Sequence, residues 1–120
     1  MITSLFAEVK HAPLTQELLD SKIPIVDIRT TGEWVETGIV KSSIPIMFFN
    51  ERGSYDAQAF LAELNKKVDT KKPFALICRT GSRTKVVSNF LDTQLGYSVT
   101  NISGGIMYHK MKTIPLVRYK

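Results

Sequence analysis

Residues 74–78 form an unbroken apolar run, Phe-Ala-Leu-Ile-Cys, directly after Pro73, and a run of this kind is compatible with few folds. A strand with one face in water alternates apolar and polar side chains. A strand that is covered on both faces is apolar throughout, as in the parallel sheets of α/β proteins. We therefore expect residues 74–78 to form an interior strand.

The segments around this run alternate between the two periodicities. Strands are predicted at residues 25–28, 43–49, 74–78 and 97–102, with Pro45 suited to an edge position. Helices are predicted around residues 14–19, over 33–37, from Asp56 as N-cap to Lys67, and in the segment of Val86, Val87, Phe90 and Leu91 that ends at Gly96. This alternation predicts an α/β fold, an open parallel sheet flanked by helices on both faces.

Length and charge limit the organisation of the chain. At 120 residues, of which 43% are hydrophobic, residues 1–120 are expected to form one domain. The N-terminal residues lack the pattern of a signal peptide, and no apolar run is long enough to span a bilayer, so we expect a cytoplasmic protein with no membrane contact. The net charge of +5 suits small anions. The basic tail, Lys110 to Lys120, is interpreted as a solvated face and not as a nucleic-acid site.

Cys78 is the only cysteine, which excludes an intrachain disulfide and a zinc site built from thiolates. It ends the apolar run, and the polar loop Arg79, Thr80, Gly81, Ser82 and Arg83 follows it and leads into a helix. Backbone N–H groups at a helix N-terminus form a cradle for anions and favour thiolate over thiol. The loop therefore predicts an ionised, reachable nucleophile at Cys78.

A structural alternative exists for Cys78, because free cysteine is among the most buried residue types. The two arginines argue against an inert core position, since charges beside a buried thiol need solvent or partners. His11 and His109 lie far from each other and from Cys78 in the sequence, so neither is assigned a metal or acid-base role.

Several blocks together resemble a single-domain rhodanese, a member of the rhodanese-like sulfurtransferases. These blocks, in the order of the family, are Asp27-Ile28-Arg29 with Glu33-Trp34, residues 78–83, Leu95-Gly96-Tyr97, Gly104-Gly105-Ile106 and Ile114-Pro115-Leu116. The resemblance implies a parallel sheet flanked by helices, a six-residue active-site loop that begins with Cys78, and a persulfide on that cysteine. It implies no metal and no organic cofactor.

The same resemblance implies roles for the loop and its surroundings. Cys78 would take the sulfane sulfur of a small anionic donor such as thiosulfate and pass it to cyanide, to a thiol or to a sulfur-accepting protein. Residues 79–83 would bind the donor, while Asp27, Arg29 and Glu33 would support the site. Arg83 has two open readings: it binds the donor, or it pairs with Asp27 or Glu33 and braces the loop.

Two rival functions differ from a sulfurtransferase enzyme. A persulfide relay or binding module would load sulfur once and release it only to a partner. A small phosphatase or arsenate reductase is disfavoured by loop length, because related phosphatases place arginine six residues after cysteine and this chain has Thr84 there. The chain also departs from the family at the turn around Gly38, at His109 in place of a tryptophan, and at Thr113 in place of a glycine.

Overall fold

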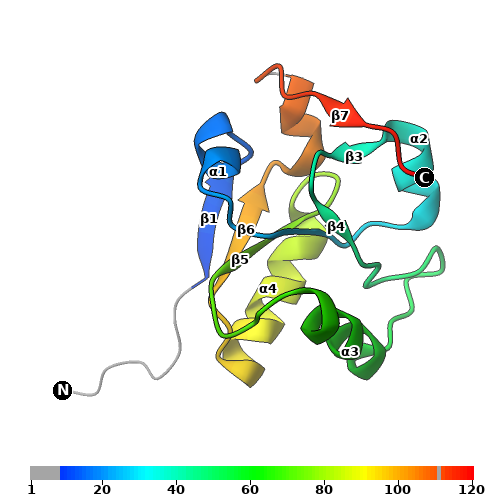
Figure 1. Cartoon of the computed structure of the whole chain (residues 1–120). Coiled ribbons are helices and arrows are strands. Elements are labelled where there is room, and N and C mark those ends of the chain that lie inside the picture. The colour runs from blue at the N-terminus through cyan, green and yellow to red at the C-terminus, as the bar shows by residue number, and fades with distance from the viewer. Residues whose placement is uncertain (1–8, 111) are drawn as a thin grey trace.

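The computed structural model describes residues 9–110 and 112–120, and its centre is a five-stranded parallel sheet. The strand order is β1 (Lys10–Pro13), β6 (Val99–Ser103), β5 (Phe74–Ile77), β2 (Ile25–Asp27) and β4 (Ile44–Pro45). A separate antiparallel pair joins β3 (Ile39–Val40) to β7 (Leu116–Val117). Strand β5 lies in the middle of the sheet and is buried along its whole length, which confirms the parallel α/β fold (Figure 1).

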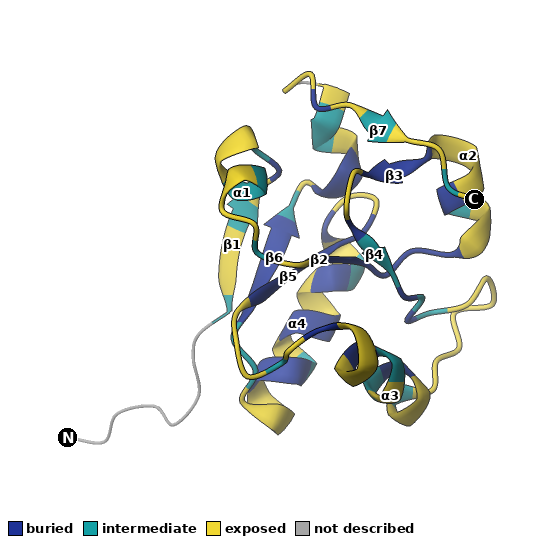
Figure 2. Ribbon diagram, in the orientation of Figure 1, coloured by how far each residue is buried: buried dark blue, intermediate teal, exposed yellow. Residues whose placement is uncertain are grey.

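Helices cover both faces of the sheet. The helices are α1 (Gln16–Asp20), α2 (Thr31–Thr37), α3 (Ala57–Lys67), α4 (Ser82–Leu95) and a 3-10 helix, η1 (Gly105–Lys110). On one face, α3 and α4 contribute Phe60, Leu64, Val87 and Leu91 to a core that includes Leu76. On the other face, residues of α1, η1 and β7 pack against alternate side chains of the same strands. Figure 2 shows the sheet interior dark between these layers.

Local signals set the ends of the helices. The Asp56 side chain accepts a hydrogen bond from the Ala59 N–H and so caps α3. Thr30 and Glu33 form a capping box at the start of α2. Helix α4 ends at Gly96, whose φ of 68° lies in the left-handed region that favours glycine.

The prediction of a strand over residues 43–49 is wrong for most of its length. Only Ile44–Pro45 pairs with β2, and Phe49 makes an isolated bridge to Tyr55. The Ile46 and Phe48 N–H groups still donate to the Asp27 and Ile28 carbonyls, but β2 ends at Asp27, where the chain turns toward α2, so no regular strand continues over residues 46–49. The predicted apolar stripe of α4 also needs one correction, since Val86 is 61% exposed.

Three short strands were not predicted. Strand β1 is polar and exposed, and β3 and β7 have two residues each, so their sequences lack a strand signal and depend on partners far away in the chain. The first helix begins at Gln16, with Thr15 as its N-cap, so Leu14 packs in the core before the helix starts. Among the described residues, none of the helices has the length and apolar character required to cross a membrane.

Candidate active site

Cys78 directly follows β5, at the carboxyl edge of the sheet where parallel α/β proteins place their functional loops. The loop after it is short, because α4 begins at Ser82 with Gly81 as its N-cap. Gly81 has a φ of 99°, a conformation that side chains other than hydrogen rarely tolerate. This backbone turn brings the first turn of α4 back over the cysteine.

The Cys78 sulfur has two polar contacts. The Gly81 N–H donates to Sγ at an N···S distance of 3.2 Å, and the Thr84 hydroxyl lies 3.6 Å from Sγ. The side chain is 0% exposed, so the expected reachable sulfur is instead covered by its own loop. The covering group is a backbone amide and not hydrocarbon alone, which leaves a donor directed at the sulfur.

The double glycine, Gly104-Gly105, and the first residues of η1 hold the other side of the loop. The Ile106 N–H donates to the Cys78 carbonyl at 2.8 Å, and the Met107 N–H donates to the Arg79 carbonyl at 3.1 Å. A Cβ at Gly105 would lie 2.5 Å from the Arg79 carbonyl and 2.6 Å from the Cys78 oxygen, so only glycine fits there. The loop is therefore fixed between α4 and η1.

Arg83 turns toward α2. Its Nη1 donates to Glu33 Oε1 at 2.7 Å, and its Nη2 donates to Glu33 Oε2 at 2.8 Å. The bidentate pair lowers the pKa of Glu33 from 4.5 to about 2, because the bound guanidinium stabilises the carboxylate. The same hydrogen bonds raise the pKa of Arg83. Of the two readings left open for Arg83, this geometry matches the brace, and the described partner is Glu33 and not Asp27.

Asp27 and Arg29 form a second, fully buried pair. The guanidinium Nη2 lies 2.9 Å from Asp27 Oδ2, and the two side chains are 0% and 1% exposed. Arg29 also donates to the Thr37 hydroxyl and to the Gly38 carbonyl, while the Trp34 indole N–H donates to Asp27 Oδ1 at 3.1 Å. These bonds connect the end of β2 with the middle and the C-terminal end of α2, so they position the helix that carries Glu33.

The remaining loop residues face solvent. Arg79, Thr80 and Ser82 are exposed, and the Thr80 and Ser82 hydroxyls lie 3.3 Å apart. Arg79 lines a cavity of about 290 Å³. Cationic side chains predominate there, since Arg79 and Lys110 line it together with Arg29, opposite a single carboxylate, Glu36. An anion of modest size would meet positive charge on this side of the loop.

Two further residues near the sulfur were not identified from the sequence as part of the site. The Thr84 hydroxyl donates to Asn101 Oδ1, and Asn101 Nδ2 lies 3.0 Å from His11 Nδ1. The contact between Asn101 and His11 follows from the register of the sheet, because β1 and β6 pair in parallel with His11 opposite Asn101. That register is not visible in the sequence of a short polar strand.

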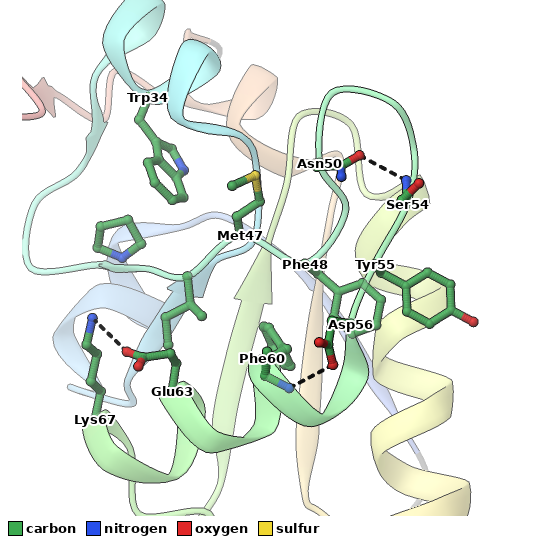
Figure 3. Close-up of a pocket in the computed structure, with 13 residues that line it drawn as sticks. Trp34, Met47, Phe48, Asn50, Ser54, Tyr55, Asp56, Phe60, Glu63 and Lys67 are labelled. Atoms are coloured by element: carbon green, nitrogen blue, oxygen red, sulfur yellow. Dashed lines mark hydrogen bonds and ion pairs between the residues drawn. The ribbon is translucent and has the colours of Figure 1, made fainter.

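A separate groove of about 510 Å³ lies between α3 and the segment that follows β4 (Figure 3). Trp34 and Met47 lie at one end and Tyr55 at the other, with Glu63 and Lys67 of α3 along its rim. Neither Cys78 nor the loop 79–83 lines it. The groove is therefore distinct from the site around the sulfur.

The described part of the chain contains no candidate metal site. No group of three or more His, Cys, Asp or Glu side chains is arranged there to hold an ion.

Comparison with known proteins agrees with this arrangement. The sequence profile of the rhodanese-like domain matches residues 11–111. The protein YtwF of Bacillus subtilis, whose name assigns it provisionally as a sulfurtransferase, is 27% identical over 109 residues, which cover 90% of this chain and 94% of YtwF.

Solved structures share the fold. A rhodanese-like domain protein from Staphylococcus aureus superimposes with a TM-score of 0.65 at 21% identity, over 93% of this chain and all of that one. Rv0390 from M. tuberculosis gives a TM-score of 0.66 at 17% identity, over 82% of this chain and 80% of that one. With a profile match across most of its length, and a cysteine loop closed between α4 and a double glycine, this chain belongs to the rhodanese-like domain family.

Proposed function

We propose that this protein is a sulfurtransferase that carries a sulfane sulfur on Cys78 as a persulfide. The observation that supports this most directly is the Gly81 N–H, which points at Sγ from 3.2 Å at the start of α4. A backbone donor in this position stabilises negative charge on the sulfur. The family membership and the name of YtwF agree with this chemistry.

The reaction consists of two displacements. In the first, the Cys78 thiolate attacks the outer sulfur of thiosulfate, the S–S bond of thiosulfate breaks, and sulfite leaves with the bonding electron pair. This forms Cys78–S–S⁻. In the second, cyanide or an acceptor thiolate attacks the terminal sulfur, and the Cys78 thiolate is regenerated. Charge balances in both steps, and neither step needs a metal, an oxidant or a reductant.

The loop length favours sulfur over phosphate. Thr84 occupies the sixth position after Cys78, is buried, and uses its hydroxyl in the contact with the sulfur. Arg83, one residue earlier, is held by Glu33. A phosphatase needs a guanidinium directed at the anion. In this structure the guanidinium is directed at a carboxylate of α2.

A small anionic donor also fits the charge around the loop. Arg79 is exposed at the cationic cavity beside η1, where Lys110 adds positive charge. Because the sulfur itself is covered, donor binding must be accompanied by a local displacement of the loop residues over it. Residues 79, 80 and 82 are the exposed residues of the loop.

The test is the intact mass of the protein after incubation with thiosulfate. We expect one added sulfur atom on the wild type, its loss after cyanide is added, and no addition on Cys78→Ser. This variant should keep the fold, because it removes the nucleophile with little change in volume. Sulfur addition to Cys78→Ser, or no addition to the wild type, would refute the proposal.

A persulfide relay is the second candidate, and the complete burial of the sulfur is the observation that favours it. A carrier has to protect its persulfide from small acceptors. Steady-state kinetics distinguish the two functions, because an enzyme forms thiocyanate repeatedly from thiosulfate and cyanide. A relay loads one sulfur per chain and stops until its partner is supplied.

A further inference from the structure

A chain of hydrogen bonds leads from the buried sulfur to the protein surface. It runs from Cys78 Sγ to the Thr84 hydroxyl at 3.6 Å, from that hydroxyl to Asn101 Oδ1, and from Asn101 Nδ2 to His11 Nδ1 at 3.0 Å. Thr84 is 0% exposed and Asn101 is 4% exposed, whereas His11 lies on the exposed edge strand β1. The chain therefore connects the reactive atom to a group that exchanges protons with water.

The donor and acceptor roles in this chain are interdependent. The Thr84 hydroxyl has one proton, and three acceptors lie within reach: Asn101 Oδ1, the Gly81 carbonyl at 3.2 Å and the Cys78 sulfur. With Asn101 Oδ1 as its acceptor, the proton points away from the sulfur. The sulfur then faces a lone pair of the Thr84 oxygen, an environment that suits a thiol S–H donor and not a thiolate.

Protonation of His11 reverses these roles. Neutral His11 can accept from Asn101 Nδ2 at its Nδ1, which fixes Oδ1 toward Thr84. Protonated His11 carries a hydrogen on Nδ1, so two donors would face each other. The amide of Asn101 resolves this by turning over, a movement that exchanges two groups of nearly equal size. Its Nδ2 then donates to the Thr84 oxygen, which frees the Thr84 proton for the sulfur.

We propose that Thr84 is a catalytic residue whose hydroxyl stabilises the charged Cys78 sulfur, and that Asn101 and His11 are positioning residues that direct this hydroxyl. This inference rests on the proposed sulfur chemistry and extends it to residues outside the loop. It requires that a proton on His11 favours thiolate, and later persulfide, at Cys78.

The surroundings of His11 contain few competing charges. His11 lines a surface pocket of about 470 Å³. Lys85 of α4 is the second ionisable side chain that lines this pocket. Strand β6 contributes Asn101 and Ser103 to this pocket, and neither ionises. On β1 itself, Lys10 precedes His11. Lys85 has no described hydrogen bond to the chain of contacts, so it serves as a control for charge alone.

The first experiment measures the ultraviolet absorbance of the thiolate, with Cys78→Ser as the blank. The protein has a single cysteine, so the signal belongs to Cys78. Thr84→Val keeps the side-chain shape without the hydroxyl, and at about pH 5.5, where an ordinary histidine is protonated, we expect a roughly tenfold lower ratio of thiolate to thiol. Thr84→Ser should restore the wild-type ratio. Equal ratios in the wild type and Thr84→Val would overturn the proposal.

The second experiment tests the direction of the coupling. His11→Gln should lower the thiolate ratio at about pH 5.5, where an ordinary histidine is protonated, and leave it unchanged at about pH 8. The same substitution in the Thr84→Val background should have no effect, because the hydroxyl that transmits it is absent. Lys85→Gln should change the ratio equally in both backgrounds. If His11→Gln changed the thiolate ratio equally in both backgrounds, His11 would act through its charge alone and not through the Thr84 hydroxyl, which would contradict the proposal.

These measurements need no sulfur donor, so their results do not depend on whether the protein transfers sulfur. If the variants behave as expected and thiosulfate adds no sulfur, the sulfurtransferase proposal fails while the hydrogen-bond chain stands. If sulfur adds normally and Thr84→Val matches the wild type in thiolate ratio and in kcat, the chain fails and the sulfurtransferase remains.

Discussion

Arg83 and Glu33, which are 50 positions apart in the sequence, form a two-pronged ion pair with N···O distances of 2.7 and 2.8 Å. The pair joins the first turn of α4, which covers the Cys78 sulfur, to the first turn of α2. Glu33 also belongs to the capping box of α2, so one carboxylate closes a helix and braces the cysteine loop. The position of the loop thus depends on a contact between two helices.

Glu33→Gln should make the protein less stable in a pH-dependent way. The folded-state pKa of Glu33, about 2, lies below its ordinary value of 4.5, so the ionised carboxylate stabilises the fold above pH 4.5. This contribution is lost as the pH falls from 4.5 toward 2. For a partly exposed pair we expect a loss of about 1 kcal/mol at pH 7. Urea unfolding of both proteins at pH 7, 4 and 2.5 measures it, and a constant difference across this range would contradict the prediction.

Arg29→Leu should destabilise the fold far more. It leaves the Asp27 carboxylate buried without its guanidinium, and such a loss typically costs about 3–5 kcal/mol. Urea unfolding at neutral pH tests this. Lys66→Ala provides the matched control, because the pair of Lys66 with Glu63 is 3.5 Å long and lies on the surface. If both variants lost the same small amount, the buried pair would not support α2.

Arg79→Ala and Arg83→Ala should separate donor binding from bracing. Arg79 is exposed and lines the cationic cavity, so its loss should raise the KM for thiosulfate several-fold with less than about 0.5 kcal/mol change in unfolding free energy. Arg83→Ala should lower the unfolding free energy by about 1 kcal/mol, because Glu33 loses its partner. Steady-state kinetics and urea unfolding on both variants decide the assignment. An unchanged stability with a raised KM in Arg83→Ala would return Arg83 to the donor site.

Thr113→Gly should stabilise the protein. Thr113 has a φ of 53°, in the left-handed region where a β-branched side chain is strained, and the family resemblance expects glycine there. Relief of this strain should raise the unfolding free energy by about 1 kcal/mol. Lys112→Gly is the control, because Lys112 has no positive φ; this variant should lose stability through the entropy of the unfolded chain and the loss of the Lys112 Nζ contact with the Tyr108 ring. A loss of stability in Thr113→Gly would show that the backbone is unstrained.

The sequence alone was sufficient for the local part of this protein. The apolar run before Cys78 predicts the central buried strand, because a strand between two layers has no polar face. Asp56 and Gly96 mark the two helix ends correctly, since a cap acts on backbone groups a few residues away. The spacing from Cys78 to Arg83 likewise describes a short loop that leads into a helix.

Tertiary structure alone decided what surrounds the sulfur. The choice of Glu33 as partner of Arg83, the burial of Cys78, and the contact of His11 with Asn101 all depend on the order and register of strands that are distant along the chain. A residue's type limits which bonds it can form, but long-range packing determines which partner lies within 3 Å of it. This is why a histidine with no evident role in the sequence lies at the end of a hydrogen-bond chain that starts at the cysteine.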